Sequence, residues 1–196
     1  MPEFAHPWDV FHATNAEITV ASSLGGTPPV DPGSVERSQN DPFSATFFAE
    51  QKALWINTPK ISSLLGQADH FDAIFFPGGH GPMYDLATNS ASQQLIAEFW
   101  GKGKVVAAMC HGPAALVNVK LADGSFLLSG NRVTGFSNQE EEIAQLTSLM
   151  PFLLETELDK SSAGNFVKTN APFAKKVVVE GRLITGQNLD STRGGC

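Results

Sequence analysis

The sequence predicts an α/β fold, a three-layer αβα sandwich of the flavodoxin-like kind around a mainly parallel sheet. Two short apolar runs, Ala73–Phe76 and Val105–Met109, have the length and composition of buried strands. Segments of helical pattern alternate with them, and this alternation is typical of crossover units between parallel strands. The 196 residues favour one domain that is large enough to bury its own core.

The first part of the chain predicts a helix at 6–13, with Trp8 and Phe11 on its buried face, and a short buried strand at 18–21. The segment 22–44 is rich in Ser, Gly and Pro, which indicates a long surface loop. A second helix is expected at 45–55. A further segment at 60–65 leads into the strand Ala73–Phe76.

The later part of the chain continues the alternation. A helix at 92–100 leads to the strand Val105–Met109, and a helical pattern follows at once at 111–117. A helix at 139–149 and short strands at 176–180 and 183–185 complete the expected elements.

Charge and cysteine content exclude several function classes. A formal net charge of −7 argues against nucleic acid or an anionic membrane as partner, because phosphate binding needs a basic face. The sequence has no apolar run of about 18 residues and no signal-peptide pattern at its start. Its two cysteines are too few for a disulfide framework, which favours a reducing, cytoplasmic location. Cys196, the last residue, is interpreted as an incidental thiol.

Cys110 stands where an apolar strand meets small residues, in the run Ala108-Met109-Cys110-His111-Gly112-Pro113. Such a strand-to-helix turn is typical of a nucleophile elbow, which lifts a side chain into the cleft at the carboxyl ends of the strands. The amino terminus of the next helix would favour a thiolate at Cys110. The alternative is a small buried core cysteine.

A glycine-rich turn, Pro77-Gly78-Gly79-His80-Gly81-Pro82, follows the first of the two strands. Its backbone N–H groups could point at one anionic oxygen. The alternative is a plain loop with glycines at positive φ. It is not a phosphate-binding loop, since the Gly-Lys-Ser/Thr ending is absent.

Taken together, these motifs resemble the ThiJ/PfpI superfamily, which is related to class I glutamine amidotransferases. The match is closer to its heat-shock-inducible branch of glutathione-independent glyoxalase III enzymes. Further segments carry it: Glu3-Phe4-Ala5-His6-Pro7, Thr134-Gly135-Phe136-Ser137-Asn138, Pro151-Phe152-Leu153-Leu154-Glu155 and Leu183-Ile184-Thr185-Gly186-Gln187-Asn188. The resemblance implies one domain over 1–196 that lacks the family's usual first strand and last helix.

The resemblance also implies residue roles. Cys110 matches the nucleophile and His111 the adjacent histidine. Glu141 matches the acid that orients this histidine, with Glu140 as the alternative if the register is shifted. Glu3 matches the buried glutamate at the sulfur, and Gly79 with the backbone of His111 would form the oxyanion site. Without the resemblance, His111 would be interpreted as structural and 140–142 as a solvated helix face.

The implied reaction converts methylglyoxal, a 2-oxoaldehyde, to D-lactate through a hemithioacetal on Cys110, so the expected enzyme is a lyase. No cofactor or metal is expected, because the five histidines lack a paired ligand pattern. His6, His12 and His70 are expected to be structural or exposed, and His80 is given no chemical role. The family usually forms homodimers.

Three other activities stay open. The same cysteine and histidine could serve a protein deglycase or another cysteine hydrolase. A stress chaperone would bind unfolded chains through an exposed apolar patch. A redox sensor would oxidise Cys110 as an exposed thiol of low pKa.

Overall fold

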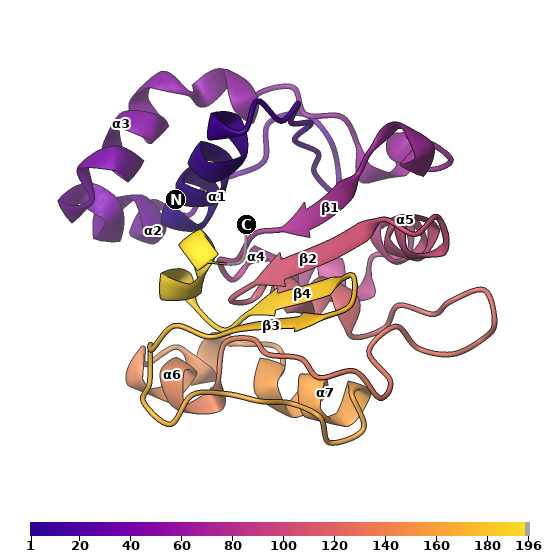
Figure 1. Ribbon diagram of the computed structural model, residues 1–196. Coiled ribbons are helices and arrows are strands. Elements are labelled where there is room, and N and C mark those ends of the chain that lie inside the picture. Colours follow the sequence, from indigo (N-terminus) through magenta and orange to yellow (C-terminus); the bar gives the residue numbers. More distant parts are fainter. Residues whose placement is uncertain (195–196) are drawn as a thin grey trace.

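The structure is a computed structural model that describes residues 1–194 of the chain. Its centre is a four-stranded sheet in the order β1-β2-β4-β3, formed by β1 Ala73–Phe76, β2 Val105–Met109, β4 Leu183–Gly186 and β3 Val177–Glu180 (Figure 1). The first three strands in this order run parallel, and β3 pairs antiparallel with β4. The predicted α/β fold class with a mainly parallel sheet is confirmed.

The register of the sheet brings three sequence motifs to one edge. Phe76 pairs with Ala108, and Met109 pairs with Gly186, so the three parallel strands end side by side. The glycine-rich turn, Cys110 and the segment after Gly186 therefore leave the sheet at the same place. This carboxyl edge is where open α/β sheets bind ligands.

Seven α-helices surround the sheet in the described part of the chain. α5 packs against β1 and β2, and Asn89 caps its first turn by accepting a hydrogen bond from the backbone N–H of Ser92. α6 and α7 lie beyond β3 in Figure 1, and α1 lies near the edge to which β1 points. The bounds of the helices are α1 Pro2–Ala13, α2 Pro32–Arg37, α3 Pro42–Glu50, α4 Gly81–Tyr84, α5 Ser90–Gly101, α6 Asn138–Ile143 and α7 Leu154–Ser161.

Two apolar clusters hold these elements together. The larger one joins α5 and the strands through side chains such as Ile96, Val106 and Leu183, which are almost fully buried. The smaller one joins α1 to α3 through Ala5 and Phe47. The smaller cluster holds the first turn of α1 in place, and this turn contains Glu3.

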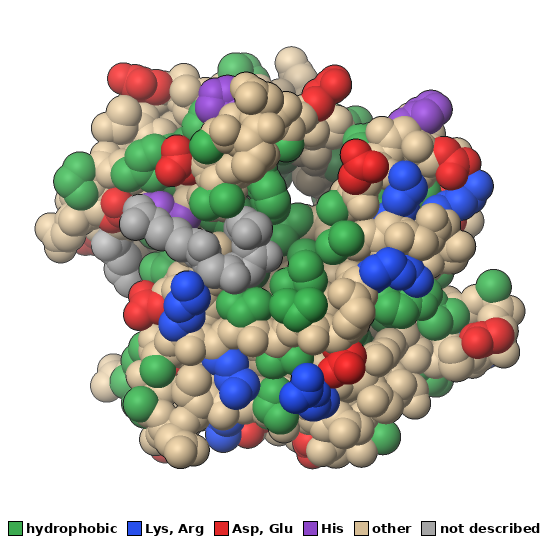
Figure 2. Space-filling model, in the orientation of Figure 1, with side chains coloured by type: hydrophobic (Ala, Val, Ile, Leu, Met, Phe, Trp, Pro, Cys, Tyr) green, Lys and Arg blue, Asp and Glu red, His purple; other side chains and the backbone are tan. Residues whose placement is uncertain are grey.

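One face of the molecule remains partly apolar. Figure 2 shows hydrophobic side chains gathered over the middle of the viewed face, with Lys and Arg side chains around them. Val179 of β3 has 58% of its surface exposed. Contiguous exposed apolar surface is typical of an interaction site.

Two expectations for the first 50 residues are wrong. The segment 18–21 forms no strand; near it, the chain makes only isolated bridges, between Ser22 and Lys60 and between Gly26 and Thr58. The segment 22–44 is not one loop, because it contains α2 and the start of α3. Asp31 caps α2 by accepting hydrogen bonds from the N–H groups of Gly33 and Ser34. A capping aspartate followed by proline is a helix start, and the composition of the segment concealed it.

Helix ends also differ from the prediction. α3 covers 42–50 instead of 45–55, and the segment 60–65 contains a 3-10 helix at Ile61–Leu64. The helical pattern at 111–117 is a 3-10 helix, Gly112–Leu116. α6 stops at Ile143 because Gln145 has a φ of 60°, which no helix accommodates, and a 3-10 helix at Thr147–Leu149 follows. α7 was not expected, although the strands and α5 are close to their predicted places.

Candidate active site

Cys110 occupies a strained turn between β2 and the 3-10 helix Gly112–Leu116. Its φ is 56°, in the left-handed region that residues with a side chain rarely adopt. Hydrogen bonds hold both sides of the turn: the Cys110 N–H donates to Gly186 O at 2.9 Å, and the Phe136 N–H donates to Cys110 O at 2.9 Å. A side chain at Gly112 would place its Cβ 2.2 Å from Phe76 O, so the turn requires glycine there. A strained backbone between a strand and a helical turn is the geometry that a nucleophile elbow requires.

Glu3 lies beside the sulfur. Glu3 belongs to the first turn of α1. Gly78 packs against both Glu3 and Cys110, because a Cβ at Gly78 would lie 2.0 Å from Glu3 Oε2 and 2.6 Å from Cys110 Cβ. The Oε2 atom of Glu3 is buried and has no hydrogen-bond partner among the described residues. The carboxyl group is therefore held in a confined space at the thiol.

The environment of Cys110 disfavours a resting thiolate. Burial, followed by the charge of Glu3, raises the pKa of the Cys110 thiol well above its usual value. The backbone N–H of His111, at the start of the following segment, lowers this pKa as expected, but burial and Glu3 outweigh it. The segment that follows is a short 3-10 helix, and Cys110 is buried, with only 3% of the residue exposed.

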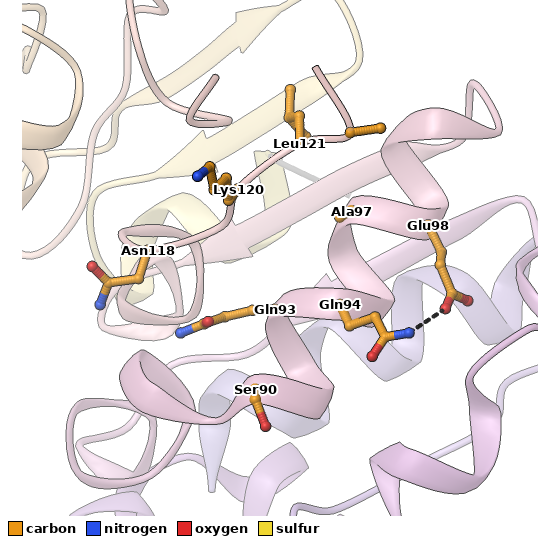
Figure 3. A pocket seen from close by; sticks show the side chains of 9 residues that line it. Ser90, Gln93, Gln94, Ala97, Glu98, Asn118, Lys120 and Leu121 are labelled. Atoms are coloured by element: carbon orange, nitrogen blue, oxygen red, sulfur yellow. Dashed lines mark hydrogen bonds between the residues drawn. The ribbon is translucent and has the colours of Figure 1, made fainter. Parts of the chain in front are cut away.

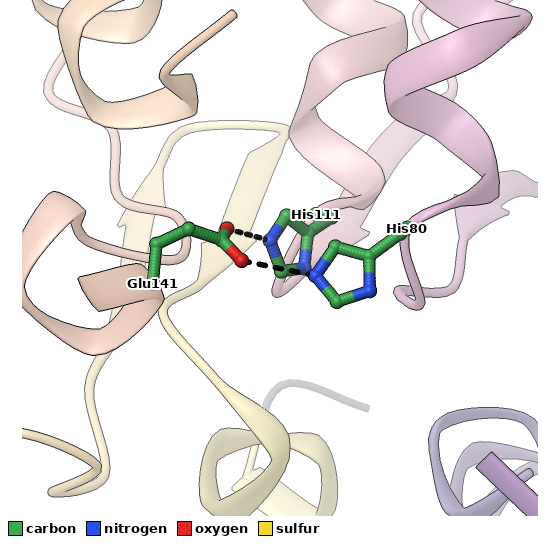
Figure 4. A group of neighbouring side chains, drawn as sticks. All are labelled: His80, His111 and Glu141. Atoms are coloured by element: carbon green, nitrogen blue, oxygen red, sulfur yellow. Dashed lines mark hydrogen bonds and ion pairs between the residues drawn. The ribbon is translucent and has the colours of Figure 1, made fainter. Parts of the chain in front are cut away.

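His111 links the thiol to a carboxylate. Its Nδ1 atom is 3.4 Å from Cys110 Sγ, and its Nε2 atom is 2.6 Å from Glu141 Oε2 (Figure 4). The ring is buried and lies 4.5 Å, between centroids, from the ring of Phe136. Cys110, His111 and Glu141 thus form a connected row of side chains.

His80 is a second partner of Glu141, and the sequence did not reveal it. Its Nε2 atom lies 3.1 Å from Glu141 Oε1, and its ring centroid is 4.2 Å from that of His111 (Figure 4). Burial alone would raise the pKa of Glu141, but hydrogen bonds from His111 and His80 outweigh it and lower the pKa to about 2. Its position one residue after Gly79 was the signal that could have identified His80.

Glu140 points to a different set of partners. Its Oε2 atom accepts hydrogen bonds from the N–H and the hydroxyl of Ser137. The Glu140 N–H donates to Ser137 Oγ, and this bond and the one from the Ser137 N–H form a capping box at the start of α6. Its Oε1 atom accepts from the N–H of Phe173 and from the side-chain amides of Gln187 and Asn188. Glu141, not Glu140, is therefore the residue at His111.

The remaining sequence-predicted residues are placed as follows. Gly79 has a φ of 82°, and a Cβ there would meet no atom within 4 Å, so the turn needs glycine for its backbone angle. His6 lies 2.8 Å from Asp41, His12 stacks on Trp8, and His70 is exposed. Cys196 lies outside the described residues.

A separate hollow of about 470 Å³ lies beside α5 (Figure 3). Its lining includes the amide side chains of Gln93, Gln94 and Asn118 and holds no cysteine or histidine. It contains none of the candidate site residues and therefore carries no argument for catalysis. In the described part of the chain, no helix has both the length and the apolar character needed to cross a bilayer.

The comparisons with known proteins identify the family. A model described as the DJ-1/PfpI family matches residues 2–193. The chain belongs to the DJ-1/PfpI family. Its fold class and the family resemblance predicted from the sequence are thereby confirmed.

Several known proteins are similar to much of the chain. Glyoxalase 3 of Candida albicans is 29% identical over 196 residues, which cover 96% of this chain and 82% of that protein. A probable glutathione-independent glyoxalase of Schizosaccharomyces pombe is 35% identical over 126 residues, or 61% of this chain and 48% of its own length.

Solved structures give the same result. The crystal structure of glyoxalase III from Candida albicans has a TM-score of 0.89 and 28% identity, and the match covers 99% of this chain and 83% of the other. The Rapid Encystment Protein of Francisella tularensis also has a TM-score of 0.89, with 33% identity over 99% of this chain and 84% of its own.

Proposed function

We propose that this protein is a glutathione-independent glyoxalase III, which converts methylglyoxal or a similar small 2-oxoaldehyde to a 2-hydroxy acid such as D-lactate. The observation that carries this proposal is the meeting of Cys110 with two acid–base groups, the Glu3 carboxyl and the His111–Glu141 pair. The glyoxalase names of the relatives support the same reaction.

The hydrogen bonds of Glu141 determine how His111 would act. Because the pKa of Glu141 is about 2, its carboxylate is ionised at neutral pH and accepts the Nε2–H of His111. The Nδ1 atom of a neutral ring is then free to accept the thiol proton as Cys110 attacks the aldehyde carbon. A thiol with a raised pKa reacts by this route because its proton leaves during the attack.

The next steps would form the acid. Backbone N–H groups of Gly79 and His111 would stabilise the oxyanion, and His111 would return its proton to give the hemithioacetal. The Glu3 carboxylate would remove the proton from the former aldehyde carbon, giving an enediolate, and deliver it to the neighbouring carbon. The hydroxyl proton of the former aldehyde would pass to the oxygen of the former ketone. The resulting thioester would be hydrolysed by water, which releases lactate and the Cys110 thiol. The atoms balance with water alone, so no cofactor is required.

The test is the consumption of methylglyoxal by the purified protein without glutathione. We expect turnover by the wild-type protein and a loss of at least about 100-fold in Cys110→Ala, because the covalent step is removed. Cooperative thermal unfolding of both proteins serves as the folding control. A folded wild-type protein without turnover, or a Cys110→Ala protein with full activity, would contradict the proposal.

We further propose that the protein acts as a homodimer in the cytoplasm. Dimerisation is usual in the family that the sequence resembles, and the apolar surface in Figure 2 offers area for an interface. The small number of cysteines favours a reducing compartment. Light scattering after gel filtration tests the dimer, and fractionation of the source cells tests the location.

A further inference from the structure

Three potential metal ligands meet at the Glu141 end of the row formed by Cys110, His111 and Glu141. His80 comes from the glycine-rich turn before α4, His111 from the turn after β2, and Glu141 from α6 (Figure 4). One ligand atom from each of these residues lies within 4.8 Å of the other two. The three residues are up to 61 positions apart in the sequence, so only the fold reveals the group.

We propose that His80, His111 and Glu141 form a binding site for Zn²⁺, and that zinc bound there reversibly inhibits the enzyme. Two imidazoles and one carboxylate are a ligand set of zinc sites with an open fourth position, whereas Mg²⁺ and Ca²⁺ prefer oxygen ligands. Nε2 of His111 lies 2.6 Å from Oε2 of Glu141, and Nε2 of His80 lies 3.1 Å from Oε1 of the same carboxylate. Both distances are near the roughly 3.3 Å between ligand atoms around tetrahedral zinc.

Burial defines the route of entry and the fourth ligand. The side chain of His80 is 26% exposed, but those of His111 and Glu141 are 2% and 5% exposed. Zinc therefore enters past His80, and water from that side completes its coordination. Cys110 Sγ is near Nδ1 of His111 while zinc takes Nε2, so the thiol is not a ligand of this site.

The inhibition follows from what zinc displaces, and this part rests on the proposed function. The metal replaces the protons that His111 and His80 share with Glu141. A neutral imidazole that binds zinc through Nε2 carries its proton on Nδ1, so His111 has no free nitrogen to accept the proton of the Cys110 thiol. Removal of zinc by a chelator restores the hydrogen bonds and the activity.

The test measures zinc binding and enzyme activity separately. Zn²⁺ is titrated by calorimetry into the Cys196→Ser protein, from which the additional thiol has been removed, and Co²⁺ absorption reports the ligand geometry. We expect one site per chain with a tetrahedral Co²⁺ spectrum. His80→Gln should weaken zinc binding by at least about tenfold and raise the inhibitory zinc concentration by the same factor. The exposed His70→Gln is the matched control and should leave zinc binding and basal activity unchanged.

Each outcome decides the proposal. Absence of zinc binding, or equal binding by His80→Gln, overturns the site. Zinc that binds through His80 without inhibiting an active enzyme overturns the inhibition. A folded protein that binds zinc through His80 but never converts methylglyoxal supports the site and contradicts the proposed function alone.

Discussion

At the scale of single residues, the thiol of Cys110 has two ionisable neighbours, Glu3 and His111, with opposite effects on its proton. Glu3 adds a negative charge beside a buried sulfur, which raises the pKa of Cys110 after the effect of burial itself. His111 offers a ring nitrogen at 3.4 Å that can accept the proton. In the proposed mechanism the thiol is protonated at rest and loses its proton only when it attacks the substrate. A sensor of peroxide would need the reverse, an exposed thiol of low pKa.

Replacing Glu3 by Gln should make Cys110 more reactive toward a simple alkylating agent. Loss of the carboxylate charge lowers the pKa of the thiol, and a decrease of one unit gives about tenfold more thiolate at pH 8. The rate of iodoacetamide alkylation, followed by mass spectrometry in the Cys196→Ser protein, measures this change. Turnover of methylglyoxal should fall in the same variant, because the proton transfer between carbons is lost.

Glu17→Gln is the matched control, since Glu17 is an exposed carboxylate. It should alkylate at the wild-type rate. Equal or slower alkylation of Glu3→Gln would show that the charge of Glu3 does not govern the thiol.

Sequence motifs identified some site residues and missed others for a physical reason. Cys110 was predictable because a strand-to-helix turn has a local signature, whereas the role of His111 came from the family resemblance. The choice between Glu140 and Glu141 depended on where α6 begins, which the capping box at Ser137 decides. The contact of His80 with Glu141 joins residues 61 positions apart, and local patterns carry no information on such a contact.

At the scale of elements, the first turn of α6 carries neighbouring glutamates with separate tasks. Glu140 is fully buried and joins the start of α6 to the segments around Phe173 and Gln187. Glu141 faces the two histidines. Glu142 is exposed.

Substitution of these three residues by Gln should separate stability from catalysis. Glu140→Gln should lower the free energy of unfolding by about 2 to 3 kcal/mol, because the amide turns an N–H group toward buried donors. Its kcat should stay near the wild-type value where the protein is folded. Glu141→Gln should lower kcat by roughly 100-fold, since His111 loses its orienting acceptor. Thermal unfolding and initial rates measure both quantities.

Glu142→Gln serves as the control and should change neither quantity. If Glu140→Gln instead abolished turnover in a fully folded protein, the assignment of Glu140 to structure and Glu141 to the site would be wrong.

The strands were the most predictable elements and the first 50 residues the least. Val105–Met109 is a continuous apolar run that is buried between neighbours, so its pattern alone defines it. The apolar residues of 18–21 gave the same signal, but they form no strand, and the nearest pairing is an isolated bridge from Ser22 to Lys60. Periodicity cannot tell whether an extended segment has a strand to pair with.

At the scale of the whole molecule, the sheet order joins distant segments into one edge. β4 pairs with β2 although 73 residues separate Met109 from Leu183, and this pairing brings the segment after Gly186 next to Cys110. Glu140 and Glu141 connect this edge to α6 through buried hydrogen bonds. The carboxylates of Glu140 and Glu141, which are ionised in the folded state, therefore hold both the fold and the candidate site together.

Stability should consequently fall in acid. The pKa of Glu141 is about 2 in the folded protein, against an ordinary value of 4.5. Burial would raise the pKa of Glu140, but hydrogen bonds from Asn188, Ser137 and Phe173 outweigh it and lower this pKa. A lowered folded pKa stabilises the protein above the unfolded pKa, and this contribution is lost as pH falls from about 4.5 to 2. For Glu141 the loss is on the order of 3 kcal/mol. Urea unfolding at a series of pH values measures it.

Glu141→Gln should show a flatter decline over the same pH range, because one of the titrating groups is gone. A decline as steep as that of the wild-type protein would mean that Glu141 does not contribute to the acid sensitivity.

The identity of the product tests the central claim most directly. Methylglyoxal is incubated with the protein in the absence of glutathione, and the lactate formed is quantified by chiral chromatography. The account predicts D-lactate in an amount equal to the methylglyoxal consumed, and none from Cys110→Ala. Loss of methylglyoxal without lactate, or racemic lactate at the rate of the uncatalysed reaction, would contradict it.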